Sequence, residues 1–113
     1  MKLIYKILLL SLVFINLNAG DIYVEKHPNK ADIKVYIAEF PLDADIWVYI
    51  EESSLFAKDH DEYWYFVKHP NLADVSIYFV KHPNLADVSV YFVTDKIRAQ
   101  WKTTDSRFLT KFK

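Results

Sequence analysis

The sequence predicts an all-β protein, folded as one compact domain of about six strand-and-turn units of about thirteen residues and preceded by an N-terminal signal helix. A twelve-residue segment recurs letter for letter thirteen positions later, and a proline separates successive runs of β-branched and aromatic residues. With 113 residues, 52% of them hydrophobic, the chain can bury one core. We expect the units to form a wrapped, two-layer sheet.

The first 19 residues have the pattern of a secretory signal peptide. Lys2 and Lys6 give a positive start, residues 7–15 are apolar apart from one serine, and Ala19 precedes Gly20. Nine residues are about half of the roughly 20 that a membrane-spanning helix needs. We therefore predict an exported protein, periplasmic or secreted, with no permanent membrane anchor.

Charge and composition remove several classes of function. The 14 Lys and Arg residues are balanced by 15 Asp and Glu residues, so the chain lacks the basic excess of a nucleic-acid-binding protein. There is no cysteine, which excludes disulfides, thiolate nucleophiles and cysteine-ligated zinc. Gly20 is the only glycine, which excludes Gly-rich phosphate loops.

The internal repeat defines the domain organisation. Residues 65–76 return identically as residues 78–89, and residues 24–37 keep the same frame with changed surface residues. Six units fill residues 20–101, the predicted β-repeat domain, and one of them has three extra residues at 59–62. Residues 102–113 form a basic tail, which we expect to pack on the domain or to extend it.

Each unit divides into a strand and a connection. Runs such as 46–50 and 75–80 favour extended structure, and apolar residues occur on both faces of their pleat, so we expect burial on both sides. The connections contain Pro28, Pro41, Pro70 and Pro83, which predict short helical or type I turns. Because tight hairpins need glycine, we expect wider, crossing connections between consecutive strands.

The repeat frame, the Ala-Asp pair and the aromatic end of each strand resemble a small bacterial family of unknown function. The Ala-Asp pair stands at residues 31–32, 44–45, 73–74 and 86–87. The resemblance covers about Asp21 to Trp101. It implies a compact β fold whose chain is tied in a seven-crossing, or septafoil, torus knot, and it implies no known activity.

Three histidines occupy one repeat position, His27, His69 and His82, each followed by Pro-Asn. Imidazoles at a fixed spacing could bind a transition metal if the turns stack in register. Duplication alone also produces this arrangement, and Phe40 replaces histidine in the second unit. We therefore predict no metal site and no cofactor.

The repeated acids and aromatic residues each have a structural explanation. Asp32, Asp45, Asp74 and Asp87 could form a carboxylate ladder, but acids at a turn more often cap backbone N–H groups. A repeated acid also lacks the distinct environments that acid–base catalysis requires, so we predict no catalytic residues and no enzyme.

Aromatic residues at equivalent strand positions could line a groove for sugars or peptides, and are more often packed in the core or across strands. They are Trp47, Trp64 and Trp101, with Tyr36, Tyr49, Tyr65, Tyr78 and Tyr91. His60 lies with Asp59, Asp61 and Glu62 in the inserted segment, where function on a rigid scaffold often resides.

Two functions remain open at this stage. The first is a non-enzymatic structural or interaction domain of high kinetic stability. The second is a binding module for a glycan, peptide or metal that uses exposed aromatics or the repeat histidines. The sequence identifies no partner, and a homodimer is an open alternative because apolar strands need their edges covered.

Overall fold

The computed structural model describes residues 20–102. The predicted signal peptide, residues 1–19, and the tail from residue 103 onward lie outside the described residues. The described chain has seven strands, namely β1 (Asp21–Val24), β2 (Ile33–Ile37), β3 (Ile46–Ile50), β4 (Tyr63–Phe66), β5 (Val75–Val80), β6 (Val88–Val93) and β7 (Gln100–Trp101). The all-β class and the six strand-bearing units predicted from the sequence are confirmed.

A single short helical turn joins each strand to the next. These turns are η2 (Pro28–Lys30), η3 (Pro41–Asp43), α1 (Ser54–Ala57), η4 (Pro70–Leu72), η5 (Pro83–Leu85) and η6 (Lys96–Arg98). In four of the five 3₁₀ turns proline is the first residue, where its fixed φ suits a helix start and its missing N–H costs nothing. The predicted short helical connections are confirmed.

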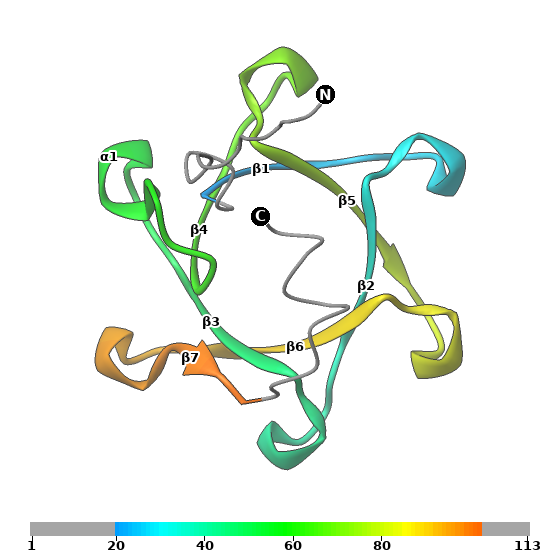
Figure 1. The fold of residues 1–113 in the computed structure, drawn as a ribbon, viewed down its shortest axis with the longest axis vertical. Coiled ribbons are helices and arrows are strands. Elements are labelled where there is room, and N and C mark those ends of the chain that lie inside the picture. The colour runs from blue at the N-terminus through cyan, green and yellow to red at the C-terminus, as the bar shows by residue number, and fades with distance from the viewer. Residues whose placement is uncertain (1–19, 103–113) are drawn as a thin grey trace, which may run out of the picture.

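The first six strands form a closed parallel barrel through which the chain winds twice. Around the barrel the order is β4, β1, β5, β2, β6, β3, and pairing of β3 with β4 closes the ring. We call β1 to β3 the first winding and β4 to β6 the second winding. Figure 1 shows the strands as a ring from which the turns project. Around this ring, strands of the first winding alternate with strands of the second. The wrapped sheet is thus a closed barrel.

Register between the two windings is regular. Ile22 pairs with Val75 and Val35 with Val88, whereas Ile33 pairs with Ile77. Each strand pairs along its first residues with one neighbour and along its last residues with the other, so the strands are strongly staggered, as barrel closure requires. β7 differs from the rest because it runs antiparallel to the start of β3.

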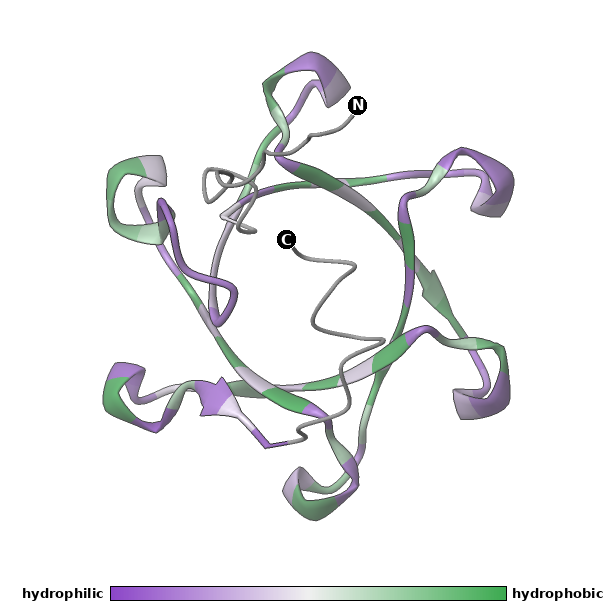
Figure 2. Cartoon of the chain, in the orientation of Figure 1, coloured by the Kyte–Doolittle hydropathy of each residue, from purple (hydrophilic) through white to green (hydrophobic). Residues whose placement is uncertain are grey.

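The interior of the barrel is filled by one face of each strand. These side chains are Ile22, Ile33, Val35, Ile46, Val48, Trp64, Val75, Ile77, Val88 and Val90, all at most 5% exposed. The opposite face is mostly half-buried: in β6, Ser89 and Tyr91 are partly exposed and Val93 is buried, so the expected burial on both sides is confirmed only in part. The inner face of a closed barrel is enclosed, whereas its outer face here is only partly shielded from solvent. Figure 2 shows the hydrophobic residues alternating along the strands.

The third unit departs from the others and closes the barrel. Here α1 replaces the proline turn, with Ser53 accepting a hydrogen bond from the Leu55 N–H at 3.3 Å. Asp59 follows in the left-handed region, at φ 67°, which lets the extra residues turn back into β4. Gly20 packs beside this segment, where a Cβ would lie 2.9 Å from the Ala57 carbonyl oxygen. Within residues 20–102 no helix has the length and apolarity to cross a bilayer.

Candidate functional site

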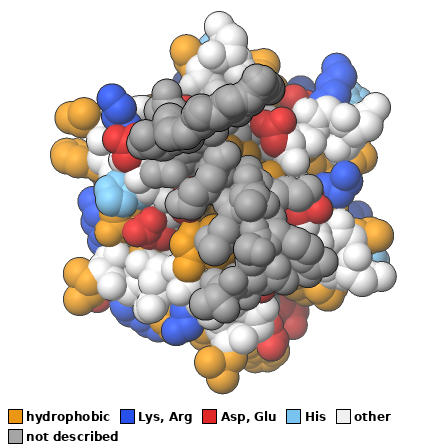
Figure 3. All heavy atoms as spheres, viewed as in Figure 1, with side chains coloured by type: hydrophobic (Ala, Val, Ile, Leu, Met, Phe, Trp, Pro, Cys, Tyr) orange, Lys and Arg blue, Asp and Glu red, His pale blue; other side chains and the backbone are white. Residues whose placement is uncertain are grey.

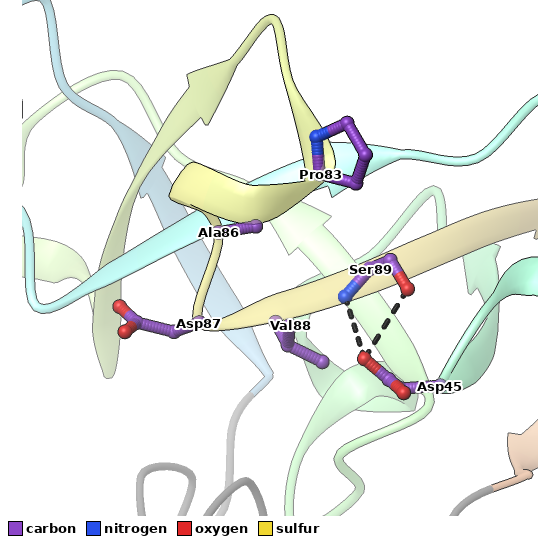
Figure 4. A pocket seen from close by; sticks show the side chains of 6 residues that line it. All are labelled: Asp45, Pro83, Ala86, Asp87, Val88 and Ser89. Carbon is purple, nitrogen blue, oxygen red and sulfur yellow. Dashed lines mark hydrogen bonds between the residues drawn. The ribbon is translucent and has the colours of Figure 1, made fainter.

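The repeated aspartates hold neighbouring strands together. Lys34 N–H donates to Asp87 at 2.9 Å, and Ser89 N–H donates to Asp45 at 2.9 Å. Asp74 and Asp32 accept equivalent bonds from the Asp21 and Ser76 N–H groups, both at 3.0 Å. Figure 4 shows Asp45 facing Ser89 across two strands of different windings.

The expectation that these acids satisfy backbone N–H groups is confirmed, but the N–H groups belong to neighbouring strands rather than to the turns. Each of these aspartates stands at the start of a strand, and its carboxylate lies within hydrogen-bonding distance of a backbone N–H group on the neighbouring strand. The acids are thus hydrogen-bond acceptors that fix the strand register.

The three repeat histidines are exposed and lie on different turns. His27 precedes η2, His69 precedes η4 and His82 precedes η5, and these turns project at separate points of the ring (Figure 1). In the described part of the chain, no group of three or more His, Asp or Glu side chains has the arrangement of a metal site. Barrel closure spreads the repeats around a circle rather than stacking their turns.

The repeat aromatics lie mainly on the half-buried outer face of the barrel. Tyr91 and Trp47 are paired across β6 and β3, with ring centroids 6.4 Å apart. Arg98 lies 5.2 Å and Lys102 4.5 Å from the Trp47 ring centroid, so cations from the last unit cover this ring. Trp64, in contrast, is fully buried in the core. These aromatics thus serve cross-strand packing.

The least regular polar arrangement lies where β3 meets β4, and we call it the seam site. It consists of Tyr49, Glu51, Phe56, Tyr63 and Lys96. The Glu51 side chain is 6% exposed and forms an ion pair with Lys96 from η6. The Lys96 ammonium also lies 4.8 Å from the Tyr63 ring centroid and 5.4 Å from that of Phe56. The hydrogen bond to Glu51 raises the pKa of Lys96 above its ordinary value of 10.5.

A cavity of about 330 Å³ opens beside this ion pair. Its lining is Tyr49, Glu51, Glu52, Phe56 and Lys96. A buried carboxylate between aromatic rings favours an ammonium group, by charge and by cation–π attraction. The site is therefore suited to hold a cation, and the ammonium of Lys96 occupies that place.

The inserted segment contributes a second buried acid next to the seam site. Asp61 is 4% exposed, and its carboxylate accepts a hydrogen bond from the Trp101 indole at 3.2 Å. Its backbone carbonyl accepts one from the Trp64 indole at 2.8 Å. His60 is exposed, 3.8 Å from Glu62 and stacked near Tyr63. The segment thus links β4, β7 and the core.

Reasoning from the repeats did not single out Glu51 or Lys96. The signal lay in two departures from the repeat: Glu51 stands where three of the other units have valine, and Lys96 stands where four of them have proline. The two residues lie 45 positions apart in the chain, and the fold brings them into contact.

Comparison with known proteins gives one clear result. The model of the 7(1) septoil knot domain matches residues 19–102, well over half of the chain. No curated protein and no solved structure is significantly similar. The matched range contains both windings and the seam site. On this evidence the chain belongs to the septoil knot domain family.

Proposed function

We propose that this protein is an exported, non-enzymatic domain whose role depends on very slow unfolding outside the cytoplasm. One observation carries the proposal: all six pairings of the barrel join a strand of the first winding to one of the second. Neither winding can detach from the barrel without breaking the hydrogen bonds that pair the strands of the other winding. Such long-range pairing favours slow folding and slow unfolding, and hence resistance to proteases.

The polar side chains support a structural role. The repeated acids are used in bonds between strands, and Glu51 is paired with Lys96. Unfolding rates measured in guanidinium and extrapolated to water test the proposal. We expect a native half-life of about a day or longer, at the slow limit for small domains. Unfolding within a second would overturn it.

A knot would strengthen the same property, and the name of the family supports one. If the chain is knotted, one terminus must pass through a loop during folding. A stable folded domain fused to that terminus would obstruct the passage. One of two fusions, N-terminal or C-terminal, should therefore refold after denaturation at least about tenfold more slowly than the unfused chain. A long unstructured Gly-Ser extension of either end is the control. Equal refolding of all four proteins would contradict the knot.

Export is supported by the pattern of residues 1–19. The proposal predicts a mature chain that begins at Gly20, which intact-mass measurement of the protein from outside the cytoplasm can test. Recovery of the full-length chain in the cytoplasm alone would contradict export.

A second candidate, a binding module, is favoured by the seam cavity. At about 330 Å³ it has the size of a small ligand site, and its carboxylate and rings would suit an organic ammonium such as a lysine side chain of a peptide. Lys96→Ala should empty the site, so butylammonium should raise the Tm of this variant more than that of the wild type. Lys58→Ala, at an exposed position, is the control. An equal effect in all three proteins would dismiss this candidate.

A further inference from the structure

One end of the barrel is apolar and open to solvent. Strands of a parallel barrel all end on the same side, and the last inward-facing residue of each strand lies there. We call these six residues the end ring: Val24, Ile37, Ile50, Phe66, Phe79 and Phe92. Exposure is 38% for Val24, 45% for Ile37 and 36% for Phe66, against 5% or less for the inner residues that precede them.

Two of the three aromatic members of the end ring share one support in the core. Phe66 and Phe92 come from different strands, yet their ring centroids lie 6.3 and 6.0 Å from that of the buried Trp64, both edge-on. The end ring is therefore a continuation of the core that reaches the surface. A contiguous apolar patch of this kind marks an interaction surface rather than scattered surface hydrophobics.

The charges around the end ring are divided between its two halves. Just past the end of each strand, two residues beyond the ring member, stands an exposed residue of what we call the charged rim. In barrel order, beginning at β4, the charged rim reads Lys68, Lys26, Lys81, Glu39, Thr94 and Glu52. One half is thus basic and the other acidic.

This distribution is complementary to itself. A two-fold axis lying in the plane of the ring, between the two halves, places the basic half of one copy against the acidic half of another. Lys81 then faces Glu39 of the second copy, and Lys68 faces Glu52, while the two end rings meet in the centre. An apolar centre inside a polar rim is the usual anatomy of a protein interface.

The described chain begins and ends at the other end of the barrel. Gly20 precedes the start of β1, and the Lys102 N–H donates to the Asp45 carbonyl at 2.7 Å, beside the start of β3. From this geometry we infer that the end ring is a dimer interface, joined face to face with a second copy of this chain.

Sedimentation velocity on the full chain tests the inference. The wild type should show twice the monomer mass at micromolar concentration, and Phe66→Glu should raise the dissociation constant at least about tenfold. Leu42→Glu is the matched control, because Leu42 is 90% exposed on η3 and lies outside the end ring. Unchanged circular dichroism of both variants shows that they fold.

Charge exchange identifies the face. Lys68→Glu/Lys81→Glu makes the charged rim mainly acidic, and Glu39→Lys/Glu52→Lys makes it wholly basic apart from Thr94. Each variant alone should be monomeric, and an equimolar mixture should regain the dimer mass. A wild type that stays monomeric at all concentrations would overturn the inference, as would a dimer insensitive to Phe66→Glu. Dimerisation only after deletion of residues 103–113 would also overturn it, since the occupant would then be the chain's own tail.

Discussion

Three hydrogen bonds join Asp45 and Ser89 across the two windings, one of them from the Ser89 hydroxyl to the Asp45 carboxylate at 3.2 Å. The Ser89 N–H donates to the Asp45 carboxylate at 2.9 Å, and the Asp45 N–H donates to the Ser89 carbonyl at 2.8 Å. The starts of β2, β3, β5 and β6 each have an aspartate that accepts a hydrogen bond from a neighbour 44 or 53 residues away in the chain. The repeated acid thus holds together elements that the chain connects only through a full turn of the barrel.

Removing one such carboxylate should weaken the whole domain. Asp45→Ala leaves the half-buried Ser89 N–H without its charged acceptor, so we expect a loss of about 1–3 kcal/mol in the free energy of unfolding. Equilibrium urea unfolding measures it. Asp43→Ala, at an exposed position on the preceding turn, should change the value by about 0.5 kcal/mol or less. Equal effects of the two changes would contradict the role given to Asp45.

The ion pair of the seam site should make stability depend on pH at the alkaline end. The pKa of Lys96 is higher in the folded chain than its ordinary value of 10.5, so its contribution is complete below pH 10.5 and is lost as the pH rises through the folded pKa. The difference in free energy of unfolding between wild type and Lys96→Met should therefore be constant at neutral pH and shrink above pH 10.5. A difference that stays constant up to pH 12 would exclude this charge effect.

Trp64 should be the most sensitive single position in the core. It is fully buried, and its indole N–H donates to the Asp61 carbonyl. Trp64→Ala should cost about 3–5 kcal/mol through the cavity that it leaves. Leu55→Ala, on a side chain that is 74% exposed, should cost about 0.5 kcal/mol or less in the same thermal or chemical unfolding experiment. A small loss at Trp64 would show that the barrel interior can collapse to fill the space.

The backbone at Asp59 should tolerate few residues. Its φ of 67° is left-handed, which Asp adopts readily and a β-branched residue does not. Asp59→Val should destabilise the domain by about 1–2 kcal/mol, measured by urea unfolding. The neighbouring Lys58 has φ −59°, so Lys58→Val should have a smaller effect. The reverse order would contradict the conformational argument.

Local structure followed closely from the residues. The β-branched and aromatic runs at 75–80 and 88–93 are the strands expected, and the turns begin at the predicted prolines. Identical segments have identical local preferences, which is why the repeat was informative. The third unit, with its inserted residues, was harder to place, because α1 there depends on Ser53 and on the extra residues rather than on proline.

The candidate site was less accessible to reasoning from residues. Glu51 and Lys96 break the repeat, but nothing in the sequence says that the third and sixth units meet. The histidines, which the repeat made conspicuous, lie on separate turns. Proximity across a barrel depends on closure, and closure is a property of the whole chain.

The amino-acid sequence by itself determined where strands and turns lie, because those depend on the φ preferences of proline and on β-branched side chains within a few residues. It also determined that the units are equivalent. Only the tertiary structure decided which strands are neighbours, that the repeated aspartates bond across windings, and that Lys96 reaches Glu51. The physical reason is that equivalent strands compete equally for every partner, and only closing the barrel around a single filled interior selects one arrangement.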